Sequence, residues 1–368
     1  MTPAEDLVRA AIARHGSIGF DELVDIALYD PSHGFYASGG QAGRRGDFLT
    51  SPEVGPLFGA VVARSIDAWW EQQGEPDLLT VVEVGAGPGT LARAVLAAAP
   101  RCAGALRYVL VERSAAQREQ HRAHLPLEVP AAAFASPPDP DDELDPAAPP
   151  PVGPIVVSLP DLPRLPGPCL VLANELLDNL SFGLLEHRQG AWHEVRVGVD
   201  GGLLVEVFTP RPSEAQAALD GARIPVQSAA AQWVRDARAL AGSGGRVIAV
   251  DYGSSTDELA ARPWTEWVRT YRSHARGGGP LDDLGRQDIT CEVAVDQLPE
   301  PASDRTQADW LRAHGIEALV EEGKAIWRAR AAIGDLAAVR ARSRVTEAEA
   351  LLDPAGLGGF RVLEWDGR

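Results

Sequence analysis

A glycine-rich turn between an apolar run and a helical pattern is the segment of this sequence that points most directly to chemistry. The stretch VVEVGAGPGTLARAVL, residues 81–96, places Gly85, Gly87 and Gly89 within five positions. Such a turn lets a ligand approach the backbone, and the ligand can be a nucleotide pyrophosphate or an adenosyl sulfonium. A dinucleotide fingerprint has glycine at its sixth position, where this chain has Thr90.

Two acids near this turn favour one ligand over the other. Glu83 lies near the end of the strand before the turn, where a carboxylate would repel a pyrophosphate but suit an ammonium and a sulfonium. Glu112 ends the next expected strand, on the order of 20 residues further on, where an acid holds a ribose with two free hydroxyls. S-adenosylmethionine carries both positive groups and no phosphate. The pattern therefore predicts an S-adenosylmethionine site, with a structural glycine turn and solvated acids as the simpler alternative.

The elements around the turn must place these residues at one edge of a sheet. From residue 79 the sequence alternates between short apolar strand patterns and helical patterns, which predicts parallel strands covered on both faces. We therefore expect an α/β fold with a doubly wound, Rossmann-like sheet. In such a sheet the ligand lies beyond the carboxyl ends of the strands.

Other polar residues are expected at the same edge. The run ANELLD supplies Asn174 for the cofactor, with Glu175 and Asp178 as candidate catalytic acids. The irregular segment 31–59 supplies Glu53 as a third catalytic candidate and Ser51 as a cofactor contact. Paired carboxylates would bind the fork of an arginine guanidinium, whereas one acid would serve as general base for a hydroxyl or amine. Each of these acids is also explained as an ordinary helix cap.

The remaining segments suggest three regions. Residues 1–78 are expected to hold N-terminal helices and an active-site loop, 79–300 the cofactor-binding core with an inserted antiparallel meander, and 301–368 helices and a final strand that completes the core. Within the core, 126–168 is predicted to be a Pro-rich, acidic surface excursion, and 254–290 a second irregular stretch.

Composition excludes several classes of partner. The formal net charge of −18 argues against nucleic acid as the main partner. Three widely separated cysteines suit a reducing compartment and indicate no metal site, and no apolar run is long enough to span a membrane. We therefore expect a cytoplasmic protein, with a homodimer as an option. His121 and His124 lie on a polar helical pattern and are predicted to be solvated.

Several blocks, taken in order, resemble one family. They are ALYDPSHGFYASGG, GDFLTSPEVGPLFG, the glycine turn, YVLVERSAAQREQ, LANELLDNL, AVDYG and DITCEV. Over roughly residues 20–300 the chain resembles the MidA family of class I methyltransferases, and the block GDFLTSPE is the most specific element of the resemblance. The family implies S-adenosylmethionine as cofactor and, in its mitochondrial members, which are complex I assembly factors, methylation of a protein arginine.

Two departures from the family pattern lie where a substrate is expected. This chain has NLS at 179–181, where the family commonly has Ala-Leu-Pro, and CEV at 291–293, where it usually has Ala-His-Val. They leave the cofactor prediction unchanged but weaken the inference of a shared substrate. The methyl acceptor is thus a protein or a small molecule. The alternatives are a catalytically inactive assembly or interaction protein with the same fold, and an NAD-linked reductase.

Overall fold

The chain divides into two units, each built from three separate segments. Unit 1 comprises Met1–Phe48, Glu175–Asp236 and Asp251–Pro301, and unit 2 comprises Leu49–Asn174, Ala237–Val250 and Ala302–Arg368. The structure, a computed structural model, describes residues 1–37, 50–134, 152–165, 167–212, 218–272 and 275–368. The expected boundaries at residues 78 and 300 do not coincide with these units, because the chain leaves unit 2 after Asn174 and returns to it twice.

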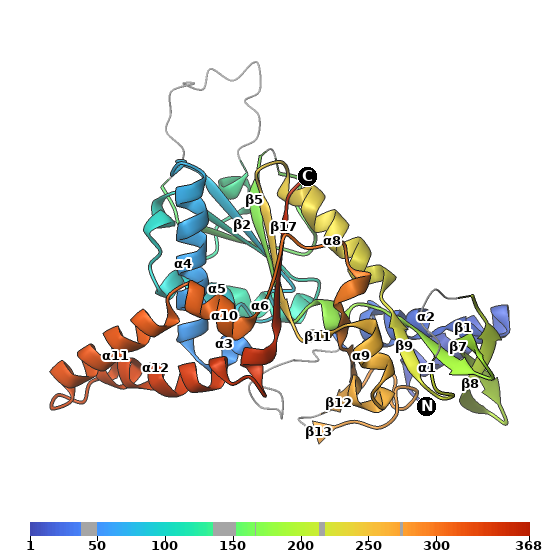
Figure 1. Cartoon of the computed structure of the whole chain (residues 1–368). Coiled ribbons are helices and arrows are strands. Elements are labelled where there is room, and N and C mark those ends of the chain that lie inside the picture. The colour runs from blue at the N-terminus through green and yellow to red at the C-terminus, as the bar shows by residue number, and fades with distance from the viewer. Residues whose placement is uncertain (38–49, 135–151, 166, 213–217, 273–274) are drawn as a thin grey trace, which may run out of the picture. The chain divides into compact units, whose positions relative to one another are not determined.

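A seven-stranded sheet forms the centre of unit 2 (Figure 1). Its strands are β2 (Leu79–Val84), β3 (Leu106–Val111), β4 (Ile155–Leu159), β5 (Cys169–Asn174), β10 (Arg246–Asp251), β16 (Ser303–Thr306) and β17 (Arg361–Asp366). The strand order is β16-β17-β10-β5-β2-β3-β4, and the pairs from β10 to β4 are all parallel. The order reverses between β2 and β5, which is the point where ligands bind in open α/β sheets. The predicted doubly wound sheet is therefore confirmed.

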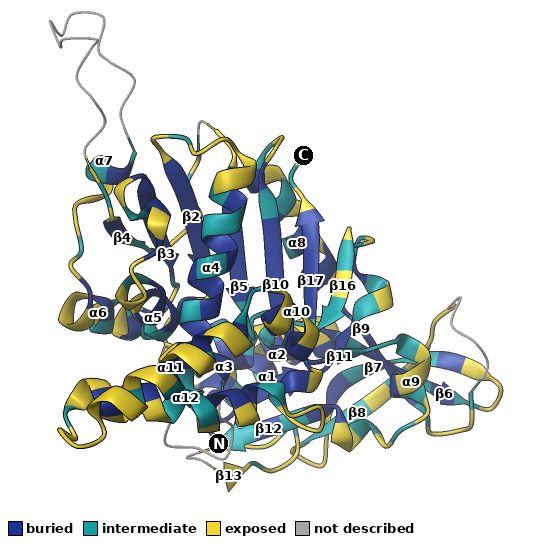
Figure 2. Ribbon diagram, turned by 60° about the vertical axis from the view of Figure 1, so that its left-hand side comes forward, coloured by how far each residue is buried: buried dark blue, intermediate teal, exposed yellow. Residues whose placement is uncertain are grey.

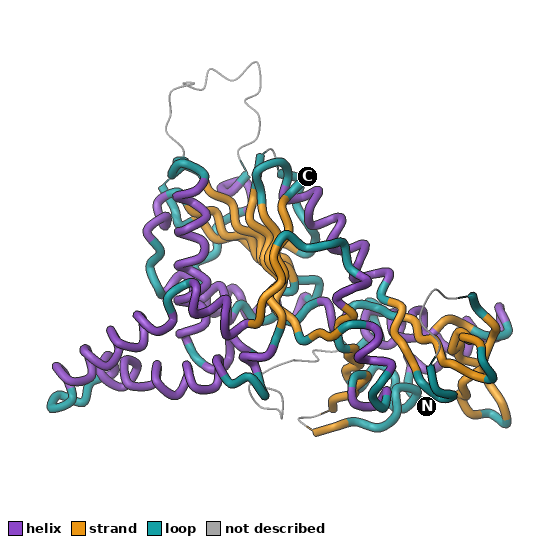
Figure 3. The backbone as a smooth tube through the Cα atoms, in the orientation of Figure 1, coloured by secondary structure: helices purple, strands orange, loops and turns teal. Residues whose placement is uncertain are grey.

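Helices cover this sheet, as Figure 3 shows by the coils beside its strands. The helices of unit 2 are α3 (Ser51–Val54), α4 (Pro56–Gln72), α5 (Thr90–Ala97), α6 (Ala115–His124), α7 (Pro130–Ala133), α10 (Gln307–Ala313), α11 (Ile316–Arg330) and α12 (Leu336–Leu352), of which α11 and α12 extend away from the sheet. Phe58 and Ile66 of α4 pack in one apolar core with Val81, Leu170 and Trp310. The central strands β2, β3 and β5 are almost wholly buried (Figure 2), which explains their near-continuous apolar sequences.

The C-terminal segment supplies two strands of the sheet, β16 and β17. β17, the last strand of the chain, lies between β10 and β16, the strand that precedes it in sequence. The edge strand β16, with the sequence SDRT, was not expected, because four polar residues carry no strand pattern. Its pairing with β17 is antiparallel.

Unit 1 contains the predicted meander. Its strands are β1 (Ile18–Gly19), β6 (Gly183–Arg188), β7 (Ala191–Asp200), β8 (Leu203–Pro210) and β9 (Arg223–Val226), and β6, β7 and β8 pair antiparallel. Both turns have positive φ at their two central residues, Gln189-Gly190 and Gly201-Gly202, which is the geometry that closes two-residue hairpins. The helices α1 (Pro3–His15) and α2 (Phe20–Tyr29) share an apolar core with this sheet, and α8 (Ser228–Ala241) follows β9.

The segment 254–290 is more regular than the sequence suggests. It contains α9 (Thr256–Ala260) and the strands β12 (Val268–Arg272), β13 (Ala275–Arg276) and β14 (Asp288–Cys291), which form one small sheet. The short strands β11 (Gly253–Ser254) and β15 (Val293–Ala294) pair parallel. Strands of two to five residues are too short to produce a recognisable hydrophobic period, so this prediction was wrong for a physical reason.

Parts of three predicted features lie outside the described residues. These are positions 38–49 of the expected active-site loop, 135–151 and 166 of the Pro-rich excursion, and 273–274 of the second irregular stretch. Within the range of the excursion, Ile155–Leu159 form the buried sheet strand β4, so this part is not a surface segment. No helix in the described portion of the chain has the length and hydropathy that a bilayer crossing requires.

Candidate active site

The glycine turn after β2 separates a packed side from an open side. Gly87 and Gly89 have φ values of 54° and 80°, in the region that favours glycine. A Cβ on Gly89 would lie 3.1 Å from Leu125 and 3.2 Å from His121, whereas a Cβ on Gly87 would meet no described heavy atom within 4 Å. Gly89 is therefore a packing position, and Gly87 is the position at which a ligand can approach the backbone.

Glu112 is held at the end of β3 by the turn itself. The Gly87 N–H donates to its Oε2 at 2.9 Å, and the Ser114 N–H donates to its Oε1 at 2.7 Å. Burial raises the pKa of this carboxyl, and the two backbone donors oppose that rise. Each carboxylate oxygen has a second lone pair, so Glu112 can still accept from ribose hydroxyls. The predicted ribose-binding acid thus lies next to the predicted glycine turn.

His121 supports the glycine turn and was not predicted as a site residue. The prediction that it is solvated was wrong: its side chain on α6 is buried, while His124 is exposed. Its Nε2 lies 2.7 Å from the Gly87 carbonyl oxygen and its Nδ1 lies 2.9 Å from the Ser158 hydroxyl. Because a carbonyl can only accept, Nε2 carries the proton and Nδ1 accepts from Ser158. Burial also lowers the pKa of His121, so the ring is a neutral support for the turn.

Glu83 is buried rather than presented to solvent. The Tyr108 hydroxyl donates to its Oε2 at 2.7 Å, and burial raises its pKa to about 8. The carboxyl is therefore largely neutral at pH 7, and the sequence argument that its charge repels a pyrophosphate does not hold in this environment. Its predicted contact with the methionine end of the cofactor, direct or through water, stays a prediction.

The three other candidates of unit 2 have different surroundings. Asn174 ends β5 and lines a small pocket with Leu91 and Trp310. Ser51 is fully buried, and its hydroxyl donates to Gln307 at 2.8 Å, a bond that a cofactor contact would have to replace. Glu53 is half-buried, and its Oε2 has no hydrogen-bond donor among the described residues. The roles of these three residues stay predictions.

A buried network in unit 1 contains the candidate acid Asp178. The Tyr252 hydroxyl lies 2.8 Å from Asp178 Oδ2 and 2.9 Å from the Thr290 hydroxyl. A phenol has one proton, so Thr290 donates to Tyr252 and Tyr252 donates to Asp178 when that acid is ionised. Asp178 Oδ1 is buried and has no hydrogen-bond partner within the described part of the chain. This oxygen is a ready acceptor for a ligand.

Asp251 organises the turn that carries Asp178. Its Oδ2 accepts the N–H groups of Leu177 and Asp178 at 2.8 and 3.2 Å, and its Oδ1 accepts the N–H of Tyr252 at 3.0 Å. Because this carboxylate accepts three backbone N–H groups, its main role is to position the segment that carries Asp178. Asp251 thereby connects the end of β10 with the segment that follows β5.

A third acid, Asp288, comes from β14 and was not predicted as a site residue. Its Oδ1 accepts from the Tyr36 hydroxyl at 3.2 Å and from the Asn179 amide at 3.1 Å. Asn179 is the first residue of the NLS departure, so this departure places a donor inside the network. The name acidic network is used below for Asp178, Asp251 and Asp288 together with Tyr36 and Tyr252.

Burial controls the ionisation of these acids. It raises the pKa of Asp178 to about 7 and that of Asp288 to about 6, and neighbouring carboxylates add to both the Asp178 and Asp251 shifts. A cation that entered this network would lower the pKa values and release protons. The network is therefore suited to bind a positively charged group whose own proton must leave.

Glu175 directly follows β5 and has an unusual backbone. Its φ of 51° lies in the left-handed region, which costs energy for a residue with a side chain. Its charge contributes to the raised pKa of Asp251. Strain of this kind is consistent with a functional position, but its predicted catalytic role stays a prediction.

The second departure occupies a structural position. Glu292, where the family commonly has histidine, pairs with Arg262 at 2.9 Å and accepts from Ser254 at 2.5 Å. Cys291 is buried and lies 3.5 Å from the Gln227 amide nitrogen. These contacts give the CEV segment packing partners without any cofactor.

The fold and the turn together identify the class of protein. A sheet with this strand order, an open glycine turn after β2 and a fixed acid at the end of β3 define a class I methyltransferase domain that uses S-adenosylmethionine. Residues 61–314 match the family model described as "Putative S-adenosyl-L-methionine-dependent methyltransferase". The chain belongs to this family, which confirms the MidA-type resemblance of the sequence.

Relatives and solved structures agree with this assignment. The chain is 26% identical over 325 residues to protein arginine methyltransferase NDUFAF7 of Danio rerio, covering 83% of this chain and 75% of the relative. The corresponding Mus musculus protein is 27% identical over 352 residues, covering 86% and 76%. A Burkholderia thailandensis structure with S-adenosyl-homocysteine bound has a TM-score of 0.74 and 26% identity, covering 98% of this chain and 91% of that chain.

Proposed function

We propose that this enzyme transfers a methyl group from S-adenosylmethionine to a guanidino nitrogen of an arginine in a protein. The observation that carries the proposal is the acidic network, in which Asp178 keeps one buried carboxylate oxygen without a partner among the described residues. The relatives named as protein arginine methyltransferases support the same acceptor.

The chemistry of the acceptor explains why such a network is needed. A guanidinium stays charged in water, and its protonated nitrogens are poor nucleophiles. Carboxylates bind its planar fork through paired hydrogen bonds and increase the electron density on the attacking nitrogen. The nitrogen gains the methyl group and loses one proton, which Asp178 is suited to accept because its pKa is about 7.

The residues of unit 2 suit the cofactor. When bound, S-adenosylmethionine supplies an electrophilic methyl group on a positively charged sulfur. Glu112 would hold the ribose hydroxyls, and Gly85 and Gly87 would allow the ligand to approach the turn. The open space beside Gly87 and the backbone-fixed Glu112 carboxylate support this assignment. His121 would keep the turn in place without contributing charge.

The acceptor is tested with methyl-labelled S-adenosylmethionine. We expect the purified enzyme to label arginine-containing peptides, with monomethyl- or dimethylarginine found after acid hydrolysis. Peptides with lysine in place of each arginine serve as the matched control and should remain unlabelled. Label found only in small molecules of a cell extract would reject arginine as the acceptor and leave the methyltransferase assignment intact.

Methylation of an arginine peptide should depend on pH through Asp178. Its raised pKa means that the acid is neutral below about pH 7 and becomes the required carboxylate above it, so kcat/KM should rise through this range. Tyr252→Phe removes the hydrogen bond that lowers this pKa, so the rising limb should move to higher pH. A flat profile between pH 6 and about 8 would contradict this role for Asp178.

A further inference from the structure

The C-terminal hairpin of unit 2 has a tip that differs in charge from the rest of the protein. The helices α11 and α12 form this hairpin, and Figure 1 shows them extending away from the central sheet. Residues 324–344, called the hairpin tip below, contain six Lys and Arg residues and one acid, Asp335, so their net charge is +5. Three of these cations form ion pairs, Lys324 with Glu321, Arg330 with Asp335 and Arg344 with Glu322, whereas Arg328, Arg340 and Arg342 have no ion-pair partner among the described residues. The whole chain carries −18, which leaves −23 on the other residues.

The same tip exposes aliphatic side chains. Ile333, Leu336 and Val339 are 67%, 69% and 57% exposed, and Ile326 is 38% exposed. Trp327 lies under the Arg342 guanidinium, whose carbon is 5.1 Å from the ring centroid. Figure 2 shows that exposed residues cover the outer end of the hairpin, in contrast to the buried sheet. Aliphatic groups surrounded by arginines have no evident role in the core of unit 2.

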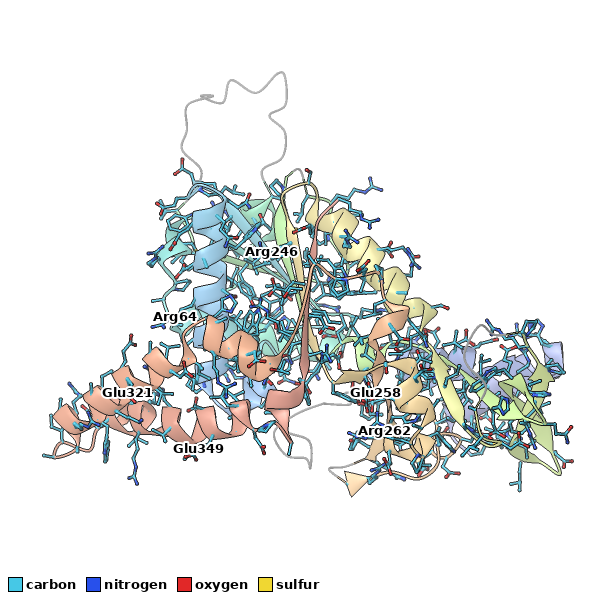
Figure 4. The ribbon with its side chains drawn as sticks, in the orientation of Figure 1. Arg64, Arg246, Glu258, Arg262, Glu321 and Glu349 are labelled. Atoms are coloured by element: carbon cyan, nitrogen blue, oxygen red, sulfur yellow. The ribbon has the colours of Figure 1, made fainter. Side chains whose placement is uncertain are left out.

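The two helices of the hairpin are closely packed against each other. A Cβ on Gly323 would lie 2.6 Å from the Ala341 carbonyl oxygen, and Arg344 donates to the Leu319 carbonyl at 2.8 Å. Figure 4 shows the acidic side chains Glu321 and Glu349 on the hairpin helices, on either side of the pair. The 15 residues of α11 make a helix of about 22 Å, which exceeds two Debye lengths at physiological salt.

We propose that the hairpin tip docks the enzyme on an anionic phospholipid surface. Arginine guanidinium groups bind lipid phosphates, and exposed aliphatic and indole groups enter the boundary between headgroups and acyl chains. The length of the hairpin keeps the negative charge near its base away from that surface. Four aliphatic side chains are too few for the roughly 800 Å² that each partner of a stable protein interface buries, but they suffice for shallow lipid contact.

The hairpin lies beyond residues 61–314, which match the family model. The hairpin tip therefore shares no residue with the glycine turn or with the acidic network. Substitutions at the tip should leave the binding of S-adenosyl-homocysteine unchanged, which allows docking to be measured independently of methyl transfer.

Flotation of the full chain with lipid vesicles tests the proposal. We expect binding to vesicles of phosphatidylglycerol and phosphatidylcholine, little binding to phosphatidylcholine alone, and weakening as salt rises. Arg340→Glu with Arg342→Glu should reduce the bound fraction at least about 25-fold, at about fivefold for each basic residue. The control variant, Arg122→Glu with Arg235→Glu, makes the same change of net charge at exposed positions outside the hairpin. Its vesicle binding should stay within about threefold of the wild type, a difference that the change of net charge explains.

A second pair of variants tests the apolar contribution. Ile333→Ser with Leu336→Ser should weaken vesicle binding about tenfold, whereas Leu203→Ser with Leu219→Ser, which alters two exposed leucines of unit 1, should not. Vesicle binding that is unaffected by the tip variants would overturn the proposal. It would also be overturned if, without lipid, the protein sedimented as a dimer that the tip variants dissociate, since the surface would then bind a second copy.

Discussion

Replacing Glu112 with Ala should reduce the affinity for S-adenosyl-homocysteine by about 10² to 10³-fold. The substitution removes the acceptor of the Gly87 N–H and the Ser114 N–H, so the turn loses a contact that holds it. It also removes charge-assisted hydrogen bonds to the ribose, each of which contributes about 1.5–3 kcal/mol. Titration calorimetry with S-adenosyl-homocysteine measures the change directly.

The control for this prediction is Glu119→Ala, which removes an exposed acid of α6 whose ion pair among the described residues is with Arg122. The affinity of this control variant for S-adenosyl-homocysteine should equal that of the wild type. Glu112→Gln should be intermediate, because one amide oxygen can accept hydrogen bonds where the carboxylate offers two oxygens. An unchanged dissociation constant for Glu112→Ala would show that the ribose is held elsewhere, and the cofactor geometry argued above would be wrong.

Replacing Asp178 with Asn should lower kcat for arginine methylation by about 10² to 10³-fold, the range expected when a group that accepts a proton and stabilises charge is lost. The affinity for S-adenosyl-homocysteine should stay the same, because the residues assigned to the cofactor belong to unit 2. Single-turnover transfer and calorimetry on the same preparation separate the two effects. Asp257→Asn, at an exposed position of α9, is the matched control.

The stability of the Asp178→Asn variant distinguishes loss of chemistry from loss of folding. The folded-state pKa of Asp178 is raised, so its stabilising contribution is present at low pH and disappears as pH rises through about 7. A neutral Asn avoids this loss, so Tm at pH 8 should be equal to or higher than that of the wild type. A kcat within threefold of wild type would contradict the role of Asp178 in transfer.

Most of the cofactor half of the site could be predicted from the sequence. Gly87, Gly89 and Glu112 belong to a local strand–turn–helix pattern and to the end of the next strand, and their spacing has a direct physical meaning. The separate roles of the two glycines could not be predicted, because they depend on Leu125 and His121 from a later part of the chain. The burial of His121 was also missed, since a polar helix pattern indicates exposure.

The acidic network could not be predicted from local sequence patterns. Asp178 was identified because it follows a strand, but the other members of its network, Tyr36, Tyr252 and Asp288, come from the two other segments of unit 1. No local sequence pattern predicts that these residues lie close together in the folded unit. Their raised pKa values follow from burial, which is a property of the packed unit and not of any single segment.

The sequence by itself determined the class of fold, the cofactor and the position of the glycine turn, because hydrophobic periodicity and residue spacing along adjacent elements are local. Only the tertiary structure decided that Glu83 is a buried and largely neutral acid, that His121 supports the turn, and which carboxyl groups share one network. The reason is that desolvation and long-range hydrogen bonds arise only when distant segments pack together, and they set the charge on each group.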